Sequence, residues 1–146
     1  MIQIRLIPLI VTLALFVMGP VWANGANSPE ALAMAFANSH RSGDVAAIVA
    51  LHHFVPTQQS SAAEQQALAR REWRALIQQY QISGYRLSML TAEERQHFRT
   101  NDSPGLAPVK KLVISLTARA GAEKQTSSHY VGRIAGRYLL INGTFK

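Results

Sequence analysis

One stretch of the chain decides the fold: residues 69–90, ARREWRALIQQYQISGYRLSML. In its first half, apolar side chains recur at the spacing of one face of an amphipathic helix. These are Ala69, Trp73, Leu76, Ile77 and Tyr80. Ser83-Gly84 then breaks the helix, and apolar residues occur from there at every second position, at Tyr85, Leu87 and Met89. The sequence therefore predicts a long helix to about Tyr80, followed by a first strand.

Two shorter helices are predicted before this long one. Ser28-Pro29-Glu30 combines a capping serine, a proline suited to the first turn and an acid at the positive end of a helix. Ser42-Gly43 ends this helix, and Asp44 caps a second one that stops shortly before Pro56. The long helix itself begins at Ser61-Ala-Ala-Glu64, which fits a capping box.

The C-terminal part of the chain has the pattern of an antiparallel sheet. Three further strands are predicted at Val109–Arg119, Gln125–Ile134 and Arg137–Asn142. Their short connections favour a meander. Helices first and a meander after them predict an α+β fold, in which N-terminal helices pack on a curved antiparallel β-sheet.

One segment interrupts this pattern between the first two strands. Thr91-Ala-Glu-Glu94 fits a second capping box, which predicts a short helix from Ala92 to about Arg99. A turn-rich stretch follows, from Thr100 to Gly105. Residues 92–105 are interpreted either as a lid over a pocket or as a plain surface loop.

The first 23 residues have the pattern of a cleaved signal peptide. Arg5 precedes a continuous apolar stretch, Leu6–Gly19, and small residues lie at Val21 and Ala23, before a predicted cut at Asn24. The apolar stretch is shorter than the roughly 20 residues that span a bilayer as a helix. An uncleaved N-terminal anchor is the alternative. The sequence thus predicts a periplasmic or secreted protein with one domain, residues 24–146.

Composition limits the partners of such an exported protein. The chain contains no cysteine, so it forms no disulfide, and 15 Lys and Arg against 8 Asp and Glu give a formal charge of +7. Outside the cytoplasm the anionic partners are envelope surfaces rather than nucleic acid, and no nucleic-acid-binding motif is present. We expect at most peripheral contact with an anionic envelope surface. The dense cluster Arg70–Arg74 is interpreted as a solvated helix face or a weak anion patch.

The order of these segments resembles the nuclear-transport-factor-two-like superfamily, which includes SnoaL-like and ketosteroid-isomerase-like domains. The likeness is carried by Pro29–Phe36, by Ser42–Leu51 with its Gly-Asp turn, and by Gly136–Ile141. It implies a small exported bacterial member with a cone-like, cystatin-like roll and often a pocket between helices and sheet. The superfamily includes isomerases, cyclases, dehydratases, ligand binders and assembly modules, so fold alone does not fix function.

A reactive constellation is not evident in the sequence. An isomerase of this kind needs a carboxylate base in an apolar pocket, but Asp44, Glu64 and Glu94 are explained as capping residues and only Glu93 lacks a structural role. His52 and its neighbour His53 diverge by about 100° on a helix and do not chelate one metal. We therefore predict no catalytic residue, no metal and no cofactor.

Six side chains are candidates to line a ligand pocket, because aromatic rings with polar tips are typical of such sites. They are His52, Trp73, Tyr80, Tyr85, Tyr130 and Tyr138. Core packing is the alternative for each. His52 lies on the apolar face of the predicted second helix, and His129 lies on the strand face opposite Tyr130.

These observations favour an exported, non-catalytic module that binds a small ligand or an envelope protein. Two alternatives stay open. One is an isomerase, cyclase or dehydratase that uses a pocket histidine such as His52 with a tyrosine. The other is a structural component of an envelope assembly, such as a homodimer that pairs through its sheet.

Overall fold

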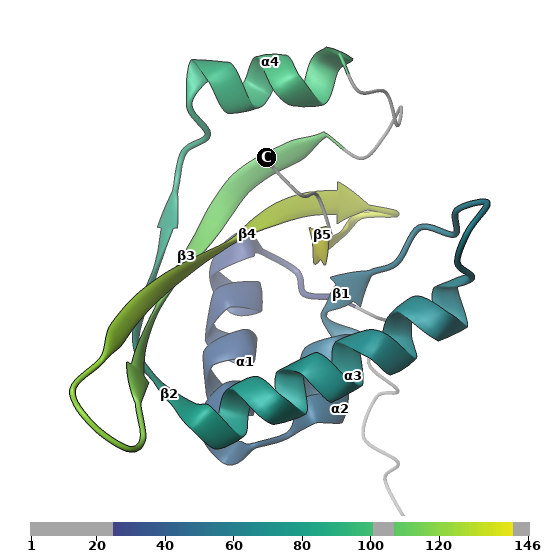
Figure 1. Ribbon diagram of the computed structural model, residues 1–146. Helices are drawn as coiled ribbons and strands as arrows, with labels where there is room; N and C mark the ends of the chain where they lie inside the picture. The colour runs from purple at the N-terminus through teal and green to yellow at the C-terminus, as the bar shows by residue number, and fades with distance from the viewer. Residues whose placement is uncertain (1–24, 101–106, 142–146) are drawn as a thin grey trace, which may run out of the picture.

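The computed structural model describes residues 25–100 and 107–141 of the chain. Three helices lie against one face of an open five-stranded sheet, and a fourth helix lies at its other side (Figure 1). The predicted signal peptide, residues 1–23, and the turn-rich residues 101–105 lie outside the described part of the chain. No helix within that part is long and apolar enough to cross a membrane.

The helices begin where the capping residues predict. They are α1 (Pro29–Ser42), α2 (Val45–Ala50), α3 (Ala62–Gln79) and α4 (Ala92–Thr100). Ser28 Oγ accepts from the Ala31 N–H at 3.0 Å, and Asp44 Oδ1 accepts from the Ala47 N–H at 2.9 Å. Ser61 and Glu64 form the expected capping box at the start of α3. Local side-chain hydrogen bonds thus determine where α1, α2 and α3 begin.

The strands confirm the predicted meander and add one element to it. They are β1 (His52–His53), β2 (Tyr80–Ser88), β3 (Pro108–Ala118), β4 (Lys124–Ile134) and β5 (Arg137–Ile141). Their order in the sheet is β1-β5-β4-β3-β2, and β2 to β5 pair antiparallel in sequence. The described residues therefore form an α+β fold with a mostly antiparallel open sheet.

Strand β1 corrects the prediction for His52. The helical pattern placed this residue on α2, but α2 ends at Ala50, and β1 pairs parallel with β5 instead. The Leu140 N–H donates to the Leu51 carbonyl at 2.8 Å, so pairing with a distant strand competes with the last helical turn and prevails. His52 is still buried, as the sequence predicts.

The change from helix to strand also lies elsewhere than predicted. Helix α3 ends at Gln79, and Tyr80 is already extended and paired in β2. Ser83-Gly84 does not break the helix but forms a bulge, seen as a register shift between Ile82 and Gly84. Met89, predicted to be in the strand, follows the end of β2 and is 69% exposed.

The main core lies between α1 and the facing side of the sheet. Leu32 and Phe36 of α1 and Ile48 of α2 are fully buried there. The sheet contributes Ile82, Leu112, Ile114, Leu116, Val131 and Leu140. We call this side of the sheet the inner face.

Helix α4 packs against the opposite, outer face, beside Tyr130 and Ile141. Its buried Glu94 accepts from Lys111 Nζ at 2.6 Å and from the Tyr130 hydroxyl at 3.2 Å. Burial raises the pKa of Glu94, but the hydrogen bonds from Lys111, the Thr91 N–H and Tyr130 outweigh it and hold this pKa below its usual value. An ion pair and a tyrosine thus fix α4 on the sheet.

We expect Lys111→Met to lower the free energy of unfolding by about 3 kcal/mol, because it leaves the buried Glu94 carboxylate without its cation. Urea denaturation followed by circular dichroism measures the change. Adding Glu94→Gln should restore most of the loss, because the buried charge is then gone. Lys110→Met is the matched control: Lys110 pairs with the exposed Glu30, and this change should cost less than about 1 kcal/mol. Equal losses in both variants would contradict this account.

Candidate functional site

A small pocket of about 230 Å³ opens on the inner face of the sheet. It is lined by Ala69, Glu72, Trp73 and Leu76 of α3, His52 of β1, and Ser127 and His129 of β4. We call it the histidine pocket. Two of the six predicted candidates, His52 and Trp73, line it. Glu72, Ser127 and His129, which also line it, were not among those candidates.

Three elements bring these side chains together. Alternation along β4 places Ser127 and His129 on the inner face, four and two residues before Val131 of the core. The parallel pairing of β1 with β5 places His52 opposite Leu140, which is itself opposite Val131 of β4. Helix α3 places the ring of Trp73 against the rings of both histidines. The strand alternation at 127, 129 and 131 is the sequence signal that would have placed His129 here.

The rings of the pocket contact one another. The Trp73 centroid lies 5.5 Å from that of His129 and 5.8 Å from that of His52. The two imidazoles are 6.4 Å apart and perpendicular. Phe36 packs edge-on against Trp73 at 5.3 Å and Phe54 lies 5.9 Å from His52. These separations are those of favourable aromatic pairs, so the three rings that line the pocket belong to a larger aromatic cluster.

Hydrogen bonding assigns the proton of His52. Its Nδ1 lies 2.8 Å from the Ile48 carbonyl oxygen, which only accepts, so Nδ1 carries the proton and Nε2 keeps a lone pair. The Nε2 atom of His129 lies 3.1 Å from Ser127 Oγ. His52 therefore offers an acceptor, and His129 is held in place by the serine.

Both pocket histidines are neutral at pH 7. Burial lowers the pKa of His52. Burial also lowers the pKa of His129, to about 4, and the nearby His52 adds to this effect. Among the described residues, no three His, Cys, Asp or Glu side chains are grouped so as to hold a metal ion.

A third histidine lies behind the aromatic cluster. His40 of α1 is fully buried, 6.4 Å from the Trp73 ring, and neither of its ring nitrogens has a hydrogen-bond partner among the described residues. Burial lowers its pKa, and the charges of Arg119 and Arg41 lower it further. No role for His40 was predicted from the sequence.

The four candidate tyrosines lie outside the histidine pocket. The Tyr80 hydroxyl donates to Glu123 Oε1 at 3.3 Å, and Tyr85 is 39% exposed. Tyr130 packs under α4 on the outer face, and Tyr138 packs at the margin of the main core. Since α4 also lies on the outer face, it does not cover the pocket as a lid.

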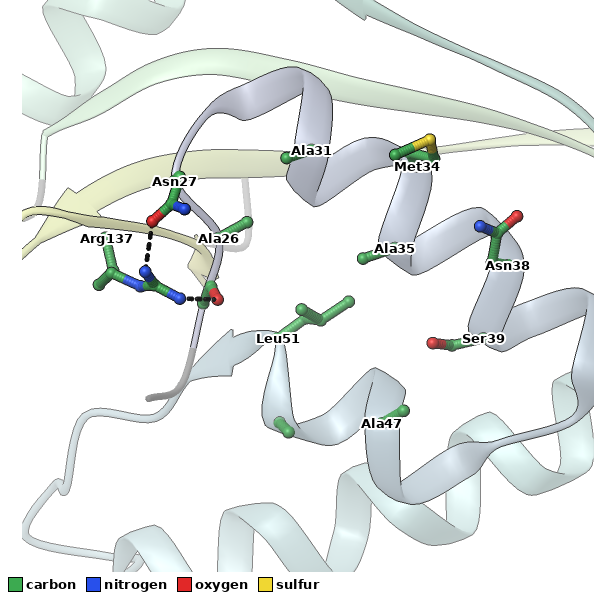
Figure 2. Close-up of a pocket in the computed structure, with 12 residues that line it drawn as sticks. Ala26, Asn27, Ala31, Met34, Ala35, Asn38, Ser39, Ala47, Leu51 and Arg137 are labelled. Atoms are coloured by element: carbon green, nitrogen blue, oxygen red, sulfur yellow. Dashed lines mark hydrogen bonds between the residues drawn. The ribbon is translucent and has the colours of Figure 1, made fainter. Parts of the chain in front are cut away.

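A second hollow lies on the far side of the helices. This α1–α2 groove has a volume of about 450 Å³ and runs between α1, α2 and the segment that enters α1 (Figure 2). Arg137 of β5 lies at one end, where its guanidinium donates to Asn27 Oδ1 and, at 3.1 Å, to the Gly25 carbonyl.

No family model, curated protein or solved structure matches the chain. The resemblance to the nuclear-transport-factor-two-like superfamily therefore stays a prediction.

Proposed function

We propose that the protein is an exported module that binds a small, uncharged, planar ligand in the histidine pocket and carries out no reaction on it. The observation that carries this proposal is the convergence of three neutral rings, His52, Trp73 and His129, on one pocket. A flat ligand would stack on or against these rings, which favour offset and edge-to-face contacts. The predicted signal peptide supports export.

The chemistry of the pocket selects a ligand with a hydrogen-bond donor. His52 Nε2 is an acceptor because the other nitrogen of the ring donates to Ile48. A ligand N–H or O–H that reaches this nitrogen replaces the water that otherwise solvates it. Because both imidazoles are neutral at pH 7 and the remaining ionisable residue of the lining, Glu72, is an acid, the pocket has no positive charge to attract an anion.

Two observations favour binding over catalysis. A general base works best with a pKa near the working pH, and the pKa of His129 is about 4. Among the described residues, the tyrosines that a histidine–tyrosine enzyme would use lie outside the pocket. The isomerase-type alternative therefore has less support than a binding role.

Indole and 1-methylindole test the proposal as probes, because they share a planar shape but only indole has an N–H donor. We expect indole to bind about fivefold to tenfold more tightly, which is about 1 to 1.4 kcal/mol and lies within the range of one net hydrogen bond. Titration followed by the ring C–H signals of the histidines in NMR spectra measures both affinities and shows which histidines respond.

His52→Phe keeps a ring and removes the acceptor, so it should abolish the preference for indole. His53→Phe is the matched control, because the neighbouring residue does not line the pocket, and it should retain the preference. If neither probe shifts the His52 and His129 signals, or if His52→Phe keeps the preference, the proposal is wrong.

A further inference from the structure

Glu72 is an acid without a partner in a basic protein. The chain carries 15 Lys and Arg against 8 Asp and Glu. Apart from Glu93, the other acids of the described residues each pair with a lysine, cap a helix or accept from a tyrosine: Glu30, Asp44, Glu64, Glu94 and Glu123. Among the described residues, only Glu72 and Glu93 are acids that form no hydrogen bond or ion pair. Of these two, Glu72 lines the histidine pocket.

The position of Glu72 on α3 leaves its carboxylate available to a ligand. Side chains three or four positions apart on a helix are neighbours, whereas those one or two positions apart are not. The four positions one turn away from Glu72 hold no basic residue: Leu68, Ala69, Ala75 and Leu76. Arg71 and Arg74 are one and two positions away and do not face it. No cation of α3 therefore competes with a ligand for this carboxylate.

The pocket offers two hydrogen-bond acceptors at different depths. His52 is buried, and its Nε2 accepts because Nδ1 donates to the Ile48 carbonyl. Glu72 lines the same pocket but is exposed, so its carboxylate lies at the mouth, where it is ionised and only accepts. The other polar pair, Ser127 and His129, is hydrogen-bonded internally at 3.1 Å. A ligand that satisfies both acceptors needs a donor at each end.

We propose that the ligand of the histidine pocket is an amino-substituted heteroaromatic ring. This inference rests on the proposed function and names the class of ligand. The ring N–H donates to His52 Nε2 at the buried end, and the exocyclic amino group donates to the Glu72 carboxylate at the mouth. Hydrogen bonds to a charged acceptor are stronger than those between neutral groups, so the amino group adds affinity.

Charge and hydrogen bonding distinguish this class from its rivals. A flat ring with a single N–H leaves the Glu72 carboxylate to water and gains nothing from it. A ring that carries a carboxylate is repelled by Glu72. A ring that carries an alkylammonium group is attracted by the charge of Glu72 alone. An aromatic amine is uncharged near neutral pH, as the proposed function requires, and still donates.

The test uses 5-aminoindole and 6-aminoindole, each compared with the methylindole of the same substitution. A methyl group has nearly the size of an amino group but no donor, and both positions lie across the ring system from the ring N–H. Titration into the full chain at pH 8, followed by the histidine ring C–H signals in NMR spectra, measures the affinities. We expect at least one aminoindole to bind about tenfold more tightly than its methyl counterpart.

Variants of the two unpartnered acids assign this preference to Glu72. Glu72→Met removes the acceptor and should abolish the preference, whereas Glu72→Gln keeps an amide oxygen and should retain part of it. Glu93→Met removes the same charge from α4, outside the pocket, and should retain the full preference. All three variants should bind the methylindoles with unchanged affinity, because the methylindoles do not use Glu72.

The results separate this inference from the proposed function. If indole binds but neither aminoindole binds more tightly than its methyl counterpart, the ligand class is wrong and the proposed function stands. A preference that survives in Glu72→Met, or disappears equally in Glu93→Met, would also overturn the inference. Tighter binding of tryptamine, whose alkylammonium group is cationic, would assign Glu72 to a charged ligand instead. If none of the indoles binds, the proposed function itself is wrong, and the inference with it.

Discussion

Lowering the pH from 7.5 to 5 is expected to destabilise the protein by at least about 2 kcal/mol. Three buried histidines, His40, His52 and His129, have pKa values below the ordinary value, in each case mainly because burial disfavours the charged ring. In the unfolded chain a histidine has a pKa of about 6.5. Below that pH the unfolded chain therefore binds protons that the folded protein does not bind, and unfolding becomes more favourable.

The sign and the window follow from linkage. The three neutral histidines contribute their full amount to the free energy of unfolding above about pH 6.5. This contribution is lost as the pH falls toward their pKa values in the folded protein. His129, with a folded pKa of about 4, contributes about 2 kcal/mol of the loss by pH 5, at about 1.36 kcal/mol per pH unit. The other two histidines add to it. Glu30, Glu64 and Glu94, whose pKa values are lowered, lose their contributions only below about pH 4.5.

Urea denaturation at pH 7.5, 6 and 5 measures this loss. His129→Gln should reduce the dependence on pH, because the side chain no longer takes up a proton on unfolding. His53→Gln leaves the three buried imidazoles in place and should keep the full dependence. A free energy of unfolding that stays constant between pH 7.5 and 5 would show that the histidines are not held neutral.

The elements predicted correctly are those that local chemistry determines. The caps at Ser28, Asp44 and Ser61 bond to backbone groups within three residues, so a short window of sequence contains all the information needed. Strands β3, β4 and β5 were also found within one residue at their starts, because their connections are short and their alternation is regular.

The features missed depend on partners that are distant in sequence. His52 leaves α2 because β5, almost 90 residues later, offers a strand to pair with. Likewise, Tyr80 is extended because it pairs with Ala118, and the bulge after Ile82 corrects the register against β3. Helical periodicity does not reveal that strand pairing competes with the helix, because Tyr80 also fits the apolar stripe of α3.

The residues of the candidate site were also only partly predictable from the sequence. An aromatic residue on a strand faces one side of the sheet or the other, and its usefulness for a pocket depends on which side the helices occupy. The sequence placed Tyr130 and His129 on opposite faces, but only the position of α3 shows that His129 faces the pocket and Tyr130 faces α4.

Phe36→Ala is expected to cost about 4 kcal/mol of the free energy of unfolding, because Phe36 is fully buried and its removal leaves a cavity in the core. Its ring also lies 5.3 Å from Trp73 and 5.8 Å from His129, so the loss should loosen the wall of the histidine pocket and weaken indole binding. Met34→Ala, on the exposed side of the same helix, should cost less than about 1 kcal/mol. Denaturation and the indole titration measure both effects. If Phe36→Ala lost stability but bound indole with unchanged affinity, the ring would support the core alone and not the pocket.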